Sequence, residues 1–213
     1  MEGFEVTKIG KHIFCILDAG NSSFYMIEGD EKAAVIDTGI TTDKKILPLL
    51  RELTDKPLLL VATHAHLDHI YHMDEFEEVY MCHDEKKIDA TTLRTLTVGR
   101  LKPWDEIHDI HTGSVISLGG TELRICQVPG HTPGSVVILE ARENYLFTGD
   151  AIGSGCGVWM QIPGSTDLKT YYDSLVHLMH WLVDNGGRLG VFRRLHCRTF
   201  KLDTRCNLFA VCI

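Results

Sequence analysis

Three histidines and one aspartate lie within six residues of this chain, in the segment Thr-His-Ala-His-Leu-Asp-His at positions 63–69. The segment directly follows Leu58–Ala62, a short apolar run that predicts a buried strand. Binding groups are often found where a strand ends and a loop begins. His64 and His66 are two residues apart, so their side chains point to the same side of an extended backbone. Because imidazole and carboxylate groups bind zinc-type ions, the segment predicts a metal site. A solvated polar turn is the alternative, but four such groups at one strand end would be costly to bury without an ion.

Two later segments also place a ligand-type residue directly after a strand. Pro-Gly-His-Thr-Pro-Gly, which contains His131, follows the strand-like run Thr121–Val128. Thr-Gly-Asp, which ends on Asp150, follows Tyr145–Phe147. Taken singly, each is an ordinary turn, because glycine and proline favour turns. Together with the histidine-rich segment, they indicate three strand ends that converge on one site.

These motifs resemble those of the metallo-β-lactamase superfamily, and the resemblance covers roughly residues 4 to 185, most of the chain. On matching positions it implies a first metal held by three histidines, His64, His66 and His131. It implies a second metal held by Asp68 and His69, with Asp150 bridging the two ions. The expected cofactor is zinc, two ions per chain, although iron and manganese accept the same ligands.

The family usually supplies one more histidine to the second metal, from a Gly-His pair near the C-terminus. This chain offers only His196, in Arg-Leu-His-Cys, which does not match that pair. His196 is therefore a candidate last ligand, and the second site is incomplete without one. Asp37, in a segment that resembles the family's early Asp-Thr-Gly turn, is expected to support the site loop by hydrogen bonds rather than to bind metal.

The charge balance changes abruptly near the C-terminus. Residues 188–213 hold six basic residues and one acidic residue, a net charge of +5, together with three of the seven cysteines. The rest of the chain holds 15 basic and 28 acidic residues, a net charge of −13. We therefore predict a metallo-β-lactamase-like domain over residues 1–187 and an atypical basic, cysteine-rich tail over residues 188–213. The tail is either a natural divergent segment or the product of a shifted reading frame.

A shifted frame also accounts for the missing Gly-His pair. With codons chosen for the purpose, DNA for Arg188–Phe200 read one base later encodes Ala-Trp-Glu-Phe-Phe-Gly-Gly-Phe-Ile-Ala-Gly-His. This peptide is apolar and ends on the pair that the family places at its last metal position. The frameshift hypothesis predicts weak binding of the second metal and a poorly packed tail, because the basic residues recur without an apolar period.

Composition limits the class of protein. The 213 residues fit one α/β domain, and a hydrophobic fraction of 44% is enough for a substantial core. No stretch approaches the roughly 18 apolar residues of a membrane helix, and no signal peptide is evident. Seven scattered cysteines form no disulfide framework, so a reducing cytoplasm is the expected location. The net charge of −8 argues against a nucleic-acid-binding protein; the oligomeric state is left open.

The apolar pattern predicts two strand-rich halves. Strands are expected at 4–9, 12–17, 23–28, 33–37, 58–62, 79–82, 114–118, 121–128, 135–140 and 144–148. Helices are expected at 43–53, at 83–96, and from the N-cap Asp167 to about Val183. His177 and His180 are expected on the surface of the last helix or in packing contacts. Each half ends in a helix, which fits the α/β fold that the family resemblance implies, an αββα sandwich of two mixed β-sheets flanked by helices.

The motifs predict a hydrolase that acts on a small-molecule substrate and on neither nucleic acid nor membrane. Two cations lower the pKa of a shared water toward 7, so a metal-bound hydroxide attacks a small ester, thioester or lactone without a side-chain nucleophile. Asp68 is the expected catalytic residue, because it can orient the water and pass a proton to the leaving group. The segments around His131 and Asp150 resemble thioesterases of the glyoxalase II type.

Two alternatives remain open at this point. One is a mononuclear iron oxygenase of the persulfide-dioxygenase kind, which resembles the same superfamily but uses mainly the first site. The other is a truncated relative that binds metal and has impaired activity, as the unusual tail would explain. Metal content and a panel of esters, thioesters and lactones distinguish these readings.

Overall fold

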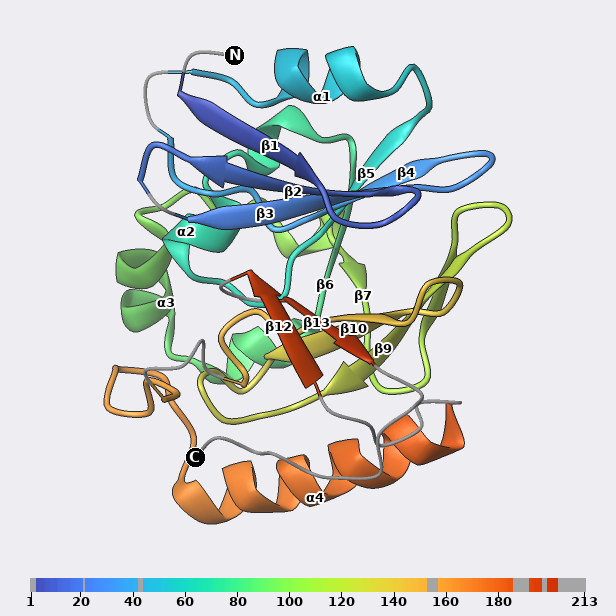
Figure 1. Ribbon diagram of the computed structural model, residues 1–213. Helices are drawn as coiled ribbons and strands as arrows, with labels where there is room; N and C mark the ends of the chain where they lie inside the picture. Colours follow the sequence, from blue (N-terminus) through green and yellow to red (C-terminus); the bar gives the residue numbers. More distant parts are fainter. Residues whose placement is uncertain are drawn as a thin grey trace.

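The computed structural model describes residues 3–20, 22–41, 44–152 and 157–185 in full, together with the backbone of residues 192–196 and 199–202. Two β-sheets lie face to face and carry helices on their outer sides (Figure 1). From top to bottom in Figure 1, the layers are α1, the first sheet, the second sheet and α4. This is the αββα sandwich predicted from the sequence.

The first sheet has the strand order β1-β2-β3-β4-β5-β6-β7. Its strands are Phe4–Lys8 (β1), Ile13–Asp18 (β2), Ser23–Glu28 (β3), Ala33–Ile36 (β4), Leu58–Val61 (β5), Glu78–Met81 (β6) and His108–Asp109 (β7). Strands β1 to β4 form an antiparallel meander, whereas β4, β5, β6 and β7 pair in parallel. The carboxyl ends of β4 and β5 therefore lie side by side at one edge of the sheet.

The second sheet has the order β12-β13-β11-β10-β9-β8. Its strands are Val115–Ser117 (β8), Glu122–Gln127 (β9), Val136–Glu140 (β10), Tyr145–Phe147 (β11), Phe192–His196 (β12) and Thr199–Leu202 (β13). All pairs within it are antiparallel. The prediction of two mixed sheets is therefore wrong for this sheet, because β8 to β11 follow one another through short turns that only antiparallel strands allow.

The helices lie on the outer faces of the sheets. In the described residues they are Leu47–Leu53 (α1), Leu67–Ile70 (α2), Ala90–Thr97 (α3) and Leu168–Asp184 (α4), with 3-10 turns at Met73–Glu75 (η1), His83–Lys87 (η2) and Trp104–Glu106 (η3). Asp167 caps α4 as predicted, since its side chain accepts a hydrogen bond from the backbone N–H of Thr170. No helix in this described part of the chain has the length and apolarity needed to cross a bilayer.

The predicted helix at 83–96 is wrong in its middle. Ile88 and Asp89 have extended backbone, so the segment is divided into η2 and α3. Asp89 accepts hydrogen bonds from two backbone N–H groups of the following turn. An aspartate with this geometry begins a new helix rather than continuing an old one.

Alternation along the strands builds three apolar layers. In β3, Phe24 and Met26 pack toward the helices α1 to α3, whereas Tyr25 and Ile27 pack between the sheets. In the second sheet, the same alternation divides β10 and β11 between the inter-sheet layer and the layer under α4. Strands buried on both faces read as continuous apolar runs, which is why they were visible in the sequence.

Hydrogen bonds tie the two sheets together at one end of the sandwich. The carboxylate of Glu143, in the turn between β10 and β11, accepts from the backbone N–H groups of Lys11 and His12 at 2.8 and 3.1 Å. The hydroxyl of Tyr145 donates to the carbonyl oxygen of Ile9. These contacts join the β10–β11 turn of the second sheet to the β1–β2 turn of the first.

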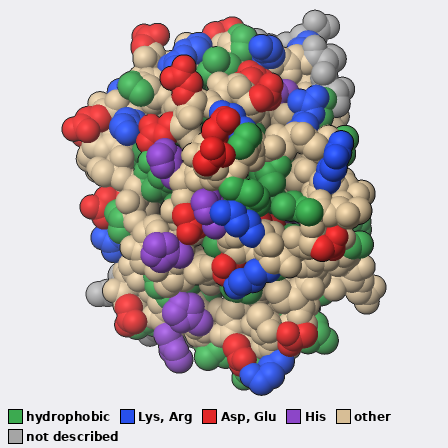
Figure 2. Space-filling model, turned by 180° about the vertical axis from the view of Figure 1, so that it is seen from behind, with side chains coloured by type: hydrophobic (Ala, Val, Ile, Leu, Met, Phe, Trp, Pro, Cys, Tyr) green, Lys and Arg blue, Asp and Glu red, His purple; other side chains and the backbone are tan. Residues whose placement is uncertain are grey.

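Several histidines lie on the surface. Figure 2 shows the face seen from behind, where histidines are visible and basic and acidic side chains are interspersed. His177 and His180 on α4 are exposed, as predicted, and so are His108 and His111. An exposed histidine is therefore ordinary in this protein, and burial is what distinguishes the histidines described next.

Candidate metal centre

The candidate site lies at the end of the sandwich opposite Glu143, where strands of both sheets end. The first sheet contributes the loops after β4 and β5, and the second contributes the turn between β9 and β10 and the loop after β11. The backbone N–H of Val136 donates to the carbonyl oxygen of Thr63 at 3.0 Å, which brings the two sheets together here. The motifs that are far apart in sequence thus meet at one edge of the fold.

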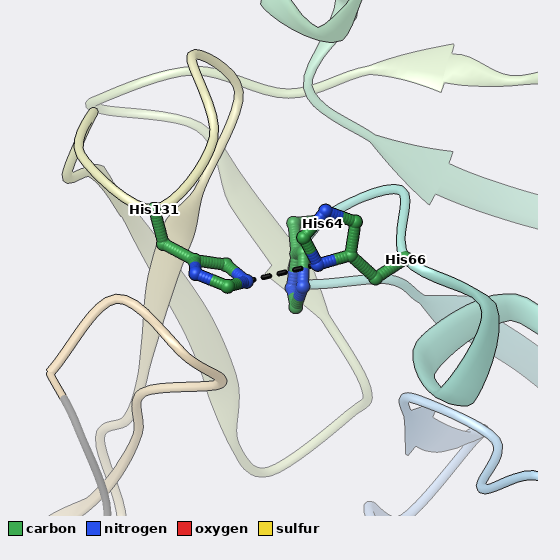
Figure 3. A group of neighbouring side chains, drawn as sticks. All are labelled: His64, His66 and His131. Atoms are coloured by element: carbon green, nitrogen blue, oxygen red, sulfur yellow. Dashed lines mark hydrogen bonds between the residues drawn. The ribbon is translucent and has the colours of Figure 1, made fainter. Parts of the chain in front are cut away.

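Three histidines form the first cluster. His64, His66 and His131 each offer one nitrogen, and these nitrogens all lie within 4.8 Å of one another (Figure 3). Nε2 of His131 is 2.9 Å from Nδ1 of His66. Nitrogen ligands on one tetrahedral zinc ion are about 3.3 Å apart, given zinc–nitrogen bonds of about 2.0–2.1 Å. The convergence of these histidines is as the sequence predicted, and their spacing fits one shared ion.

The ring of His131 is fixed by its second nitrogen. Nδ1 lies 2.7 Å from the carbonyl oxygen of Trp159. Because a carbonyl can only accept, Nδ1 carries the hydrogen and Nε2 keeps its lone pair, which faces the cluster. A partner of this kind commonly orients a histidine that binds metal.

Two imidazoles of the cluster, those of His66 and His131, are held neutral. Burial, followed by the proximity of His131 and His69, lowers the pKa of His66 to about 3. Burial also lowers the pKa of His131. Neutral imidazole is the form that coordinates a metal ion, so the electrostatics of the cluster favour a ligand role at neutral pH.

The second cluster contains carboxylates as well as imidazole. His64, His69 and Asp150 bring one ligand atom each within 4.8 Å of one another. Nε2 of His69 is 3.5 Å from the carboxylate of Asp68 and 3.8 Å from that of Asp150. The Asp150 carboxylate is also 3.6 Å from Nε2 of His131, so it lies between the two clusters. Asp68 and His69 are on the short helix α2, which was predicted as loop.

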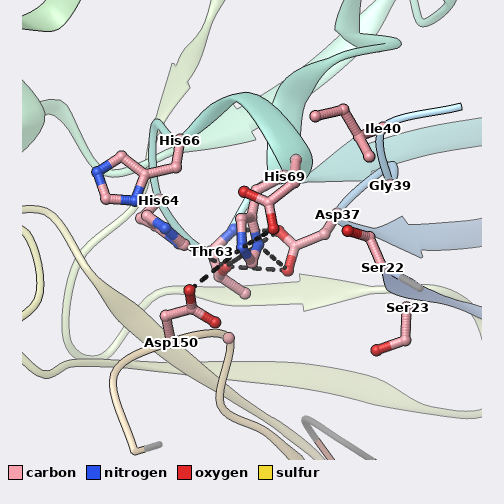
Figure 4. A network of polar contacts seen from close by, with 12 residues as sticks. Ser22, Ser23, Asp37, Gly39, Ile40, Thr63, His64, His66, His69 and Asp150 are labelled. Carbon is pink, nitrogen blue, oxygen red and sulfur yellow. Dashed lines mark hydrogen bonds and ion pairs between the residues drawn. The ribbon is translucent and has the colours of Figure 1, made fainter. Parts of the chain in front are cut away.

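Asp37 and Thr63 support this cluster by hydrogen bonds (Figure 4). One carboxylate oxygen of Asp37 accepts from Nδ1 of His69 at 2.8 Å, and the other accepts from the backbone N–H of Thr63 at 2.8 Å. The Thr63 hydroxyl also contacts both oxygens at 3.0 Å. The prediction that Asp37 supports the site loop by hydrogen bonds is confirmed. Its φ of 61° lies in the left-handed region, a strained conformation found often at functional sites.

A glycine allows the Asp150 loop to approach this network. Gly149 has a φ of +48°, and a Cβ atom built on it would lie 2.4 Å from Oγ1 of Thr63. Any larger residue would push the loop after β11 away from the first sheet. The Gly-Asp pair, which alone would indicate an ordinary turn, is thus the contact that brings Asp150 to the histidines.

Sequence reasoning missed two parts of the site. Thr63 contacts Asp37, His64 and His69, and its place at the end of β5 could have indicated this role. The carbonyl of Trp159 had no sequence signal, because any residue type supplies a carbonyl. The side chain of His196 lies outside the described residues, so its role as last ligand stays a prediction.

An αββα sandwich with imidazoles and carboxylates at one end of its sheets is the architecture of a metal-binding enzyme. Residues 17–180 match the family model described as "Metallo-beta-lactamase superfamily", and the chain belongs to this superfamily. The predicted family resemblance is therefore confirmed.

Relatives and solved structures agree with this assignment. The human protein named "Acyl-coenzyme A thioesterase MBLAC2" is 27% identical over 84% of this chain and 77% of its own length. "Hydroxyacylglutathione hydrolase" of Francisella tularensis is 34% identical over 56% of this chain and 43% of its own length. In fold, the chain is similar to "Metallo-beta-lactamase from Pontibacter korlensis", with a TM-score of 0.62 and 21% identity over 83% of this chain and 85% of that one. The protein is a metal-dependent hydrolase, as the sequence predicted.

Proposed function

We propose that the protein is a dinuclear zinc hydrolase. His64, His66 and His131 would hold one ion, Asp68 and His69 the other, and Asp150 would bridge them. The observation that carries this proposal is the position of the Asp150 carboxylate, 3.6 Å from Nε2 of His131 in one cluster and 3.8 Å from Nε2 of His69 in the other. Zinc fits nitrogen and carboxylate ligands together, although iron and manganese accept the same donors.

We further propose that the substrate is a small thioester. Both relatives whose names state a reaction cleave, by those names, an acyl–sulfur bond. Among the described residues, the buried thiols of Cys82 and Cys126 have pKa values that burial raises to about 11 and 12. Thiols of that kind are poor nucleophiles at neutral pH, so water is the better candidate to attack the carbonyl carbon.

Bound cations would lower the pKa of a water toward 7 and polarise the carbonyl. Asp68 would move the proton; this role is supported by its carboxylate, which lies 3.5 Å from Nε2 of His69, and by the 27% of its side-chain surface that is exposed. Water adds to the carbonyl carbon, the carbon–sulfur bond breaks, and the proton passes through Asp68 to the departing sulfur. The products are a carboxylic acid and a thiol. His69, held by Asp37, keeps its Nε2 aimed at this region.

The test combines metal analysis with a substrate panel. Protein purified without added metal is analysed for zinc, iron and manganese, and is assayed on acyl-coenzyme A, hydroxyacylglutathione, aryl esters and lactones. We expect two zinc ions per chain, thiol release from thioesters, loss of turnover with a chelator and recovery with zinc. As a control, the variant His177→Ala, which changes an exposed histidine of α4, should keep the zinc content and the turnover of the wild-type protein. One iron per chain with oxygen uptake would support an oxygenase instead, and turnover that survives complete metal removal would contradict the proposal.

We also propose that residues 188–213 are encoded in a shifted reading frame. It is supported by the charge reversal, the three cysteines and the absent Gly-His pair. Sequencing the gene decides the matter, because codons that yield no Gly-His in another frame would end the hypothesis. His196→Ala tests the alternative, since loss of one zinc ion would make that residue the last ligand.

A further inference from the structure

A carboxyl group outside the two clusters contacts the turn that carries His131. Glu85 belongs to η2, His83–Lys87, and its surface is fully buried. Its Oε1 accepts hydrogen bonds from the hydroxyl of Thr132 and from the backbone N–H of Gly134, the latter at 3.1 Å. Thr132 directly follows His131, so Glu85 holds the turn that presents this histidine.

Close packing supports the same contact. A Cβ atom built on Gly134 would lie 2.6 Å from Cγ of Glu85 and 2.7 Å from its backbone nitrogen. Thr132 also binds Ser135 twice, through its hydroxyl at 2.8 Å and through its backbone N–H at 3.1 Å. The turn therefore packs directly against η2, and Glu85 holds it by hydrogen bonds.

The second oxygen of the same carboxyl group, Oε2, is buried and has no hydrogen-bond partner among the described residues. Burial raises the pKa of Glu85 to about 7, while the hydrogen bonds from Thr132 and Gly134 act in the opposite direction. A buried carboxyl group is costly compared with an apolar residue of similar size, so packing alone gives no reason for a glutamate here.

We propose that Glu85 is a positioning residue for the first metal: by holding the His131 turn, it sets the distance between the imidazole of His131 and those of His64 and His66. The inference rests on the proposed ligands of the first metal. It goes beyond them by assigning the geometry of that site to a residue that binds no ion and lies in a different part of the fold.

The chain contains a matched control for this role. Glu140 is also buried, and it accepts hydrogen bonds from the hydroxyl of Thr121 and from two backbone N–H groups, those of Arg142 and Glu143. Glu140 and Val136 are the two ends of β10, so Glu140 lies about 13 Å from the site end along this strand, at about 3.3 Å per residue. The two glutamates share their burial and their kind of partners but not their proximity to the histidines.

The experiment compares Glu85→Gln with Glu140→Gln in the full chain. Zinc affinity is measured by competition with a chelator, and the absorption spectrum of the cobalt-substituted protein reports coordination geometry. Groups that support metal ligands affect metal affinity by about 10–100-fold, and Glu85 acts through backbone, so we expect a loss of about tenfold with an altered spectrum. Glu140→Gln should leave both unchanged, even if it lowers the unfolding temperature equally.

Two outcomes overturn the inference. Unchanged affinity and spectrum in a folded Glu85→Gln protein would reduce Glu85 to a stability role, as would equal changes in both variants. If either glutamine variant fails to fold, Thr132→Val and Thr121→Val replace the pair, since each removes the hydroxyl that binds the glutamate, together with the contact to Ser135 in the case of Thr132, and the same comparison decides. Failure of the wild-type protein to bind zinc through His131 would instead contradict the proposed function, which keeps the two failures distinct.

Discussion

The two clusters of the site differ in the chemistry of their side chains and in their exposure. The first consists of three imidazoles, and the ring of His131 is fixed by the Trp159 carbonyl. The second places a fully buried His69 beside two carboxylates whose side chains are each 27% exposed. The comparison teaches that one part of the site consists of imidazoles alone, whereas the other adds partly exposed carboxylates, which are the groups that can exchange protons.

The largest expected effect is on the first cluster. His131→Ala removes a proposed ligand of the first metal, so we expect tight zinc binding to be lost and kcat/KM to fall by at least about 10³-fold, equivalent to about 4 kcal/mol of transition-state stabilisation. Metal content and thioesterase kinetics provide the measurement, with His177→Ala as the control. Retention of both zinc and turnover would remove the distinction between the clusters.

Asp68→Asn tests the second cluster, which contains the proposed catalytic residue. The side chain keeps its size and loses its ability to carry a proton, so we expect turnover to fall by about 10²-fold, the usual effect of removing a general acid or base. Zinc at the first cluster should stay bound, because its three histidines are unchanged. A neutral effect on turnover would favour a one-metal mechanism.

Asp37→Asn tests the support of the second cluster. Asparagine tolerates a positive φ, so the backbone is preserved while the charged acceptor for Nδ1 of His69 is lost. We expect zinc affinity at the second cluster to fall by about tenfold, measured as the weaker of two binding steps in calorimetry. A loss confined to the stronger step would show that the clusters share their support.

The last expected effect is on the free energy of unfolding and depends on pH. Burial raises the pKa of Glu85 from 4.5 in its ordinary state to about 7, and Asp84 is the charged neighbour that acts in the same direction. A raised carboxyl pKa contributes stability that is fully present below pH 4.5 and is lost as the pH rises through 7. Between pH 5 and 8, metal-free wild-type protein should therefore lose about 2 kcal/mol relative to Glu85→Gln. Urea unfolding of both proteins measures the difference; parallel pH profiles would contradict it.

The sequence predicted the parts of this molecule that follow local rules. Strands buried on both faces appear as apolar runs, and Asp167 is a residue type that commonly caps the first turn of a helix, as it does in α4. The ligand-type residues His64, His131 and Asp150 were found because each directly follows such a run. The antiparallel order of the second sheet was not predicted, because the apolar pattern carries no strand direction.

Other features depend on contacts between distant segments. The roles of Glu85 and the Trp159 carbonyl arise only when η2 and the loop after β11 fold back onto the His131 turn. The break at Ile88 and Asp89 was missed because an aspartate at this position fits both a helix surface and a new N-cap. The contacts of Glu85 and of the Trp159 carbonyl, which join residues tens of positions apart, could not be predicted from the sequence.

The hydrogen bonds between Glu143 and the β1–β2 turn join the two sheets at one end of the sandwich. At that end, in the described part of the chain, only hydrogen bonds of the protein join the sheets, whereas at the other end a metal would add to the bond between Val136 and Thr63 a link between residues such as His66 and His131, which are 65 positions apart. An ion there acts as a reversible cross-link, and its removal should loosen the site end before the Glu143 end. After chelation, the amide hydrogen of Val136 should exchange with solvent sooner than those of Lys11 and His12, so that loss of the cofactor is felt as a partial parting of the two sheets.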